Sequence, residues 1–179
     1  MGTIKATNIE PIADNGTVTL GSSGDTFSLG SGVKQSNLNY PAFSVYLNAT
    51  SSGILNSTYT KVTSFVEEYD TDSAFASDKF TVPTGKAGKY MIQAQARFNV
   101  SGSTSNLAVL KIQVNGSDGS PMHIENANFC NGSGNIRLNA NGIYDLSVGD
   151  YVEMLVYQNI TTANLLADVT WFQGHRIGT

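Results

Sequence analysis

The sequence predicts an all-β protein, and three observations lead to that prediction. Short segments alternate apolar and polar side chains, as strands with one buried face do. Glycine and asparagine punctuate these segments at regular spacing, which is typical of a sandwich or a barrel. No stretch shows a helical period of apolar residues over several turns. We therefore expect a sandwich or a barrel of many short strands.

The clearest alternation lies in residues 88–99. One face of this segment is apolar and comprises Tyr90, Ile92, Ala94, Ala96 and Phe98. The other face is polar or long-chained and comprises Met91, Gln93, Gln95 and Arg97. Because successive strand side chains point to opposite sides, we expect one long strand with one buried face. A similar strand should pair with it on either side.

The remaining strands start at Pro41 and follow in order. Alternation predicts strands over 43–47, 61–66 and 79–83, the last of them ended by its proline, which cannot donate to a ladder. A polar loop of Asn, Ser and Gly is expected over 48–57, and an acidic loop over 67–77. After the long strand, a polar turn is expected over 101–106. The C-terminal strands are predicted over 107–114, 123–129, 135–146, 151–157 and 169–177.

The predicted strand 151–157 is apolar on both faces. One face holds valines and a methionine, and the other carries Tyr151, Leu155 and Tyr157 around Glu153. A strand of an antiparallel sheet with one solvated face should be polar on the outside. Since no helix is predicted to cover that side, we expect a second subunit to cover it. Tyr151, Leu155 and Tyr157 are the predicted subunit contact.

Charge and composition exclude several classes of function. The net charge of −4 and the absence of a Lys/Arg cluster argue against a phosphate-binding or nucleic-acid-binding surface. The single cysteine excludes an intrachain disulfide. His123 and His175 have no partners at metal-ligand spacing, so no metal site is predicted. The acidic residues of 67–77 are interpreted as a solvated turn, with a Ca²⁺-binding loop as the alternative.

No catalytic motif is present, so we expect a non-enzymatic protein without a cofactor. The sequence contains no Gly-x-Ser-x-Gly, phosphate loop or dinucleotide fingerprint. No apolar run approaches the ~20 residues that a membrane-spanning helix needs. The N-terminus lacks a basic region followed by an apolar core, so no signal peptide is expected and the chain should be made in the cytoplasm.

Residues 1–40 differ in texture from the rest and are expected to form a separate unit. They are rich in Gly, Ser and Thr, and Thr19-Leu20-Gly21-Ser22 recurs as Ser28-Leu29-Gly30-Ser31. Such short pieces cannot bury their apolar faces within one chain. Two explanations remain open, namely a disordered linker or an extended β-rich stem in which several copies wrap around one axis.

Four ordered motifs in residues 41–179 resemble a known family. They are Pro41–Val45, Gly88-Lys89-Tyr90, Leu146–Val152 and Phe172-Gln173-Gly174. Together they are similar to the C1q-like branch of the complement and tumour-necrosis-factor jelly rolls. The resemblance implies a ten-stranded antiparallel jelly-roll sandwich that assembles as a tight homotrimer, with residues 41–179 as its head.

Residues 16–26 are similar to stretches that precede such domains in bacteriophage virion proteins, notably in marine cyanophages. This resemblance implies a virion structural protein, made in the host cytoplasm, that forms a trimeric fibre, spike or whisker. Residues 1–40 would be the stem that attaches it to other virion proteins. Alternatives are a capsid decoration trimer, a surface-polysaccharide depolymerase and a secreted C1q-like adhesin.

Adsorption to host-surface glycans or proteins would fall to the polar loops of the head. Their Asn, Ser and Thr groups suit hydroxyl-rich ligands, and several copies would add avidity. The residues that we expect to contribute are Asn48, Asn56, Ser101, Asn106 and Asn115.

Overall fold

The computed structural model describes residues 40–101, 106–117, 124–130, 133–160 and 162–178. The predicted stem, apart from Tyr40, lies outside these residues. The chain divides into two units after Leu38, and we call the second, Asn39–Thr179, the head. Nothing in the described part of the chain forms a helix that is long and apolar enough to span a membrane.

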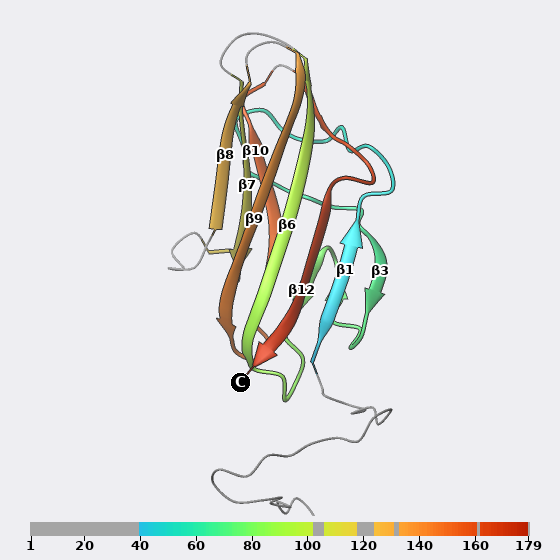
Figure 1. Cartoon of the computed structure of the whole chain (residues 1–179), viewed down its shortest axis with the longest axis vertical. Coiled ribbons are helices and arrows are strands. Elements are labelled where there is room, and N and C mark those ends of the chain that lie inside the picture. The colour runs from blue at the N-terminus through green and yellow to red at the C-terminus, as the bar shows by residue number, and fades with distance from the viewer. Residues whose placement is uncertain (1–39, 102–105, 118–123, 131–132, 161, 179) are drawn as a thin grey trace, which may run out of the picture. The chain divides into compact units, whose positions relative to one another are not determined.

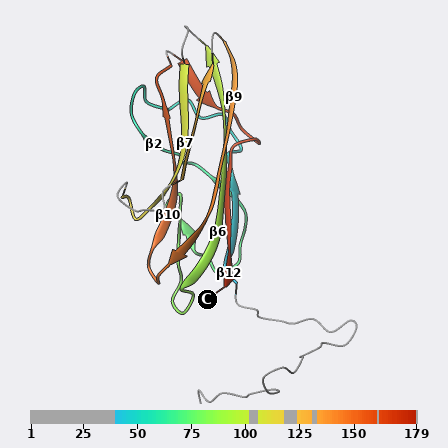
Figure 2. The same ribbon diagram turned by 60° about the vertical axis from the view of Figure 1, so that its left-hand side comes forward.

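The described residues of the head form two six-stranded sheets in which the named strands pair antiparallel, and Figures 1 and 2 show the sheets as two layers. The first sheet contains β1 (Ala42–Tyr46), β3 (Val66–Asp70), β6 (Gly88–Ser101), β9 (Gly134–Leu146), β11 (Thr162–Leu165) and β12 (Trp171–Gly178). The second contains β2 (Thr60–Lys61), β4 (Phe75–Ala76), β5 (Lys79–Thr81), β7 (Asn106–Val114), β8 (Ile124–Cys130) and β10 (Tyr151–Gln158). The predicted all-β sandwich is confirmed.

The long strand β6 lies inside the first sheet, as predicted. Its residues pair with β9 on one side, from Gly88 to Val100, and with β12 and then β11 on the other. Burial alternates along its whole length, and the predicted apolar face is almost fully buried. The alternation in the sequence therefore predicted both that β6 has a partner strand on each side and which of its faces is buried.

Aromatic rings from both sheets meet in the core. The Phe43 ring of β1 stacks on Phe80 of β5 with ring centroids 4.8 Å apart, and on Phe75 of β4 at 5.3 Å. Phe172 of β12 meets Phe43 edge-on at 5.1 Å. Each such pair contributes on the order of 1 kcal/mol beyond the apolar area that it buries. These contacts hold the two sheets together near the start of β1.

Two sequence predictions between residues 61 and 77 were wrong. In place of a strand over 61–66 the chain forms the short β2 and, after a break, β3. The acidic loop therefore begins only after Asp70. The strand was missed because β3 is the edge of its sheet, pairs only with β1, and has an exposed centre with no apolar alternation.

The other predicted strands are confirmed with ends shifted by a few residues. Two further strands, β4 and β11, were not predicted. The first has two residues and lies within the predicted acidic loop. The second has four residues that pair with the end of β6, with one bridge from Leu165 to Ser51, and show no pattern of their own. The described residues thus form twelve strands, two more than the resemblance implied, and both β2 and β4 are only two residues long.

Gly174 in β12 explains one of the four motifs. A Cβ atom built there would lie 2.5 Å from Ile92 Cδ1 and 2.9 Å from Phe43 Cε1, both of them buried core atoms. Only glycine lets β12 pack against these side chains without displacing them.

We therefore predict that Gly174→Ala lowers the free energy of unfolding by about 1–3 kcal/mol, the cost of overpacking a core. Gly53→Ala is the matched control, since Gly53 has no atom within 4 Å of its would-be Cβ. It should leave stability unchanged or raise it slightly. Chemical denaturation of both variants measures the difference, and equal effects would contradict the packing argument.

Tyr90 is the one described side chain with a large pKa change. It is fully buried, and its hydroxyl donates to the Lys86 carbonyl at 2.6 Å. Burial raises its pKa to about 12, with nearby Arg176 opposing and Asp72 adding to that change.

Stability should therefore fall as the pH rises from about 10 to about 12. In this window the unfolded chain has released the Tyr90 proton near its ordinary pKa of about 10, while the folded chain still holds it, so alkali favours unfolding. Tyr90→Phe should lose about 1 kcal/mol near neutral pH with the hydrogen bond. It should also show a shallower alkaline decline in denaturation measured across this window. Parallel declines for the variant and the native chain would contradict this assignment.

Candidate functional site

The predicted subunit contact lies on the outer face of the second sheet. Burial alternates along β10, so Val152, Met154 and Val156 fill the core while the opposite side chains are half-buried. Tyr151, Leu155 and Tyr157 therefore share one outer surface. We call this surface, together with the neighbouring Tyr59, the β10 face.

Side chains of the same chain cover part of the β10 face. The Tyr59 ring packs against Tyr157 with centroids 5.3 Å apart. The Lys79 ammonium lies 4.2 Å from the centre of the Tyr151 ring, a favourable cation–π geometry. Lys61 pairs with Glu153 at 3.0 Å. The chain thus supplies some of the cover that the sequence analysis assigned to another subunit, and the contact itself stays a prediction.

Burial extends sideways from the β10 face onto β7. Val109 and Lys111 face outward beside Tyr157 and Leu155, yet each is only 3% exposed. The Lys111 ammonium lies 4.6 Å from the centre of the Tyr59 ring. The result is an outer layer of aromatic rings and lysine stems over the middle of the second sheet.

Four of the five predicted loop residues lie at one end of the sandwich. Asn48 and Asn56 belong to the segment after β1, and Asn56 bridges to Gln158 at the end of β10. Ser101 ends β6, Asn106 begins β7, and Figure 1 shows these strand ends together. The head begins at the opposite end, where β1 starts beside the end of β12. We call the end that carries the four residues the distal end.

Asn115 lies away from the distal end, in the turn that follows β7. Its side-chain amide donates to the Asp150 carboxylate at 2.8 Å, and its side-chain oxygen accepts from the Tyr151 backbone N–H at 2.9 Å. The same Asp150 carboxylate accepts from Ser147 N–H at 2.7 Å. Asn115 therefore ties its turn to the Gly-Asp turn before β10, and the structure separates it from the other loop residues.

Asn115→Ala should lower the free energy of unfolding by about 1–3 kcal/mol, because it removes two hydrogen bonds between turns. Asn48→Ala, in an exposed loop, should change stability by less than about 0.5 kcal/mol. Thermal unfolding of the two variants shows which of the two residues stabilises the fold and which can be changed without loss of stability, as a ligand-binding loop residue can. An Asn115 variant as stable as the Asn48 variant would overturn this distinction.

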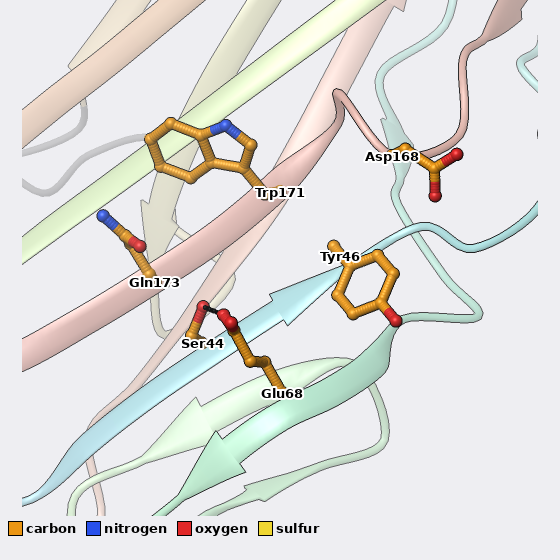
Figure 3. A pocket seen from close by; sticks show the side chains of 6 residues that line it. All are labelled: Ser44, Tyr46, Glu68, Asp168, Trp171 and Gln173. Carbon is orange, nitrogen blue, oxygen red and sulfur yellow. Dashed lines mark hydrogen bonds between the residues drawn. The ribbon is translucent and has the colours of Figure 1, made fainter.

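A cavity of about 450 Å³ lies on the outer face of the first sheet, and sequence reasoning missed it. Figure 3 shows the six side chains that line it, which come from β1, β3, β12 and the turn before β12. They are Ser44, Tyr46, Glu68, Asp168, Trp171 and Gln173. Tyr46 and Trp171 are direct cross-strand neighbours, as are Ser44 and Gln173. We call this cavity the Tyr46–Trp171 pocket.

Local backbone irregularities place the two carboxylates of the pocket. The pairing of β1 with β3 shifts register between Ser44 and Val45, so Glu68 is the extra residue of a bulge. Its carboxylate accepts a hydrogen bond from Ser44 Oγ at 2.9 Å. Asp168 has a φ of 59° in the tight turn before β12, a conformation that aspartate tolerates better than most residues. Gln173 is held by its amide, which donates to Gln93 at 2.9 Å.

The alternation of 43–47 and 169–177 places Ser44, Tyr46, Trp171 and Gln173 outward, which was the available signal for this pocket. That signal was insufficient to predict the pocket, because the sequence does not show that β1 and β12 are neighbouring strands.

The structure brings together no cluster of metal-binding side chains among the residues that it describes. Asp70 instead caps the loop between β3 and β4, since its carboxylate accepts from Phe75 N–H at 2.6 Å and Asp72 N–H at 3.3 Å. His175 is exposed on the outer face of β12. His123 lies outside the described residues.

Comparisons with known proteins identify the fold. No family model matches the chain, and no curated protein matches it. The globular domain of zebrafish complement 1qA protein matches with a TM-score of 0.57 and 18% identity, over 76% of this chain and 97% of that one. A crystal structure of murine APRIL matches with a TM-score of 0.53 and 13% identity, over 77% of this chain and 99% of that one. The head is therefore similar to C1q/TNF-like jelly rolls in fold.

Proposed function

We propose that this chain is a non-enzymatic structural subunit that assembles as a homotrimer into a virion fibre, spike or whisker. The observation that carries the proposal is the β10 face, which is apolar and aromatic on the outside of a sheet. The motifs that resemble C1q-like jelly rolls imply a trimer, and residues 16–26 supply the resemblance to phage virion proteins.

The β10 face has the make-up of a contact between subunits. Leu155 and the rings of Tyr151 and Tyr157 form an apolar centre. Around it, Lys61 and Glu153 already neutralise each other within the chain. Burying this surface against another copy would cover the apolar area of Leu155 and the two rings, while the Lys79 and Lys111 ammonium groups stay over the Tyr151 and Tyr59 rings.

The two ends of the head support a role in adsorption. The described part of the head begins at Tyr40, and the polar segment 48–57 lies at the distal end, away from that point. If the preceding residues attach the head to the virion, the distal end faces outward. Asn48, Asn56 and their neighbours would then meet host-surface glycans or proteins, and three copies on one axis would strengthen weak single contacts.

The purified chain should have a mass three times its 19.0 kDa monomer mass in sedimentation or light scattering. Leu155→Glu should reduce that mass to the monomer value, because it places a charge in the apolar centre of the contact. Circular dichroism then checks that the variant keeps its β-sheet content.

Ile143→Glu is the matched control. Ile143 is 47% exposed on the outer face of the first sheet, so the same change there should leave the trimer intact. A stable monomer of the native chain would contradict the proposal. Dissociation by the Ile143 variant alone would move the contact to the first sheet. Gold-labelled antibody on intact virions then distinguishes a tail fibre from a capsid decoration.

A further inference from the structure

We infer that the Tyr46–Trp171 pocket binds a small organic cation, an ammonium group carried on a body the size of a monosaccharide or an amino acid. The inference does not rest on the proposed trimer. The pocket lies on the outer face of the first sheet, whereas the β10 face belongs to the second.

The charge of the pocket selects a cationic ligand. Among the described residues that line it, only Glu68 and Asp168 are charged. Within the described parts of the chain neither carboxylate forms an ion pair, whereas Glu153 and Asp72 each pair with a lysine. Two unneutralised carboxylates beside one cavity repel phosphate, sulfate and carboxylate ligands and attract an ammonium.

The two carboxylates of the pocket require hydrogen-bond donors from the ligand. The Ser44 hydroxyl already donates to Glu68, and the Gln173 amide already donates to Gln93. The carboxylate oxygens of Glu68 and Asp168 remain as acceptors, since an ionised carboxylate has several acceptor positions and no donor. An ammonium carries three donors and no acceptor, so it matches these carboxylate oxygens.

Tyr46 and Trp171 supply the other half of the recognition. Both rings are half-buried and lie on the neighbouring strands β1 and β12 (Figure 3). Aromatic faces attract cations, and tryptophan does so best. The cavity volume of about 450 Å³ falls in the range of ~300–1,000 Å³ typical of small-molecule sites, so the ligand's body also fits.

The probe that we choose is glucosamine, with N-acetylglucosamine as its uncharged counterpart. Trp171 is the only tryptophan of the chain, so its fluorescence reports directly on the pocket. At about pH 6 the amine of glucosamine is protonated. We expect a saturable change of Trp171 emission with glucosamine, at least about tenfold weaker affinity for N-acetylglucosamine, and weaker glucosamine binding as salt is added.

Two conservative variants test the carboxylates without removing the fluorophore. Glu68→Gln keeps an oxygen that accepts from Ser44, and Asp168→Asn suits the positive φ of that turn. Each should weaken glucosamine binding about fivefold, as loss of one exposed ion pair does. Asp145→Asn is the control, an exposed carboxylate of the first sheet that does not line the pocket, and it should leave binding unchanged.

Three results would overturn the inference. The first is unchanged Trp171 emission on addition of glucosamine. The second is equally tight binding of N-acetylglucosamine, which would indicate a neutral-sugar site. The third is binding of glucosamine by the two carboxylate variants as tight as that of the native chain. The mass of each variant is measured in parallel. If the native chain is a trimer but does not bind glucosamine, only the proposed ligand is contradicted. If it is a monomer that binds glucosamine, only the proposed assembly is contradicted.

Discussion

The head depends on the pairing of β6 with partners on both sides. Its apolar residues all face inward because side chains alternate strictly along a strand. A slip of one residue against β9 or β12 would turn that whole face to solvent. The register is therefore held by core burial as well as by hydrogen bonds. The aromatic contacts of Phe43 and the close approach at Gly174 follow from that register, since each requires β1 and β12 to lie where β6 places them.

Because the inner faces of the two sheets form the core, any binding surface must lie on their outer faces or at the ends of the sandwich. The two outer faces differ in chemistry. The second sheet presents rings and lysine stems around Leu155, a surface suited to another protein subunit. The first sheet presents Gln93, Gln173 and the acidic pocket beside Trp171, a surface suited to a small polar ligand. One sandwich can therefore carry assembly and ligand binding without either competing for the same residues.

The sequence predicted those features that depend on local alternation. The long β6, the two-faced β10 and the fold class all follow from period two. The sequence-based prediction failed where a strand's position in the sheet, rather than its local pattern, determines which residues it carries. Edge strand β3 carries Glu67 and Glu68 because its centre meets solvent, so it resembled a loop. Neither the Tyr46–Trp171 pocket nor the separation of Asn115 from the distal end could be predicted, because both depend on which strands are neighbours in the sheets. No single segment of the sequence encodes that order.

The central claim is that identical copies cover the β10 face. Hydroxyl-radical footprinting of the native assembled protein measures the solvent accessibility of Tyr151, Leu155 and Tyr157 directly, with exposed Tyr69 on edge strand β3 as an internal reference. Our account predicts that all three side chains are labelled far more slowly than expected from their partial exposure in a single chain. Tyr69 should be labelled at the rate of an exposed side chain. Labelling of the three at the rate expected for a single chain would contradict it.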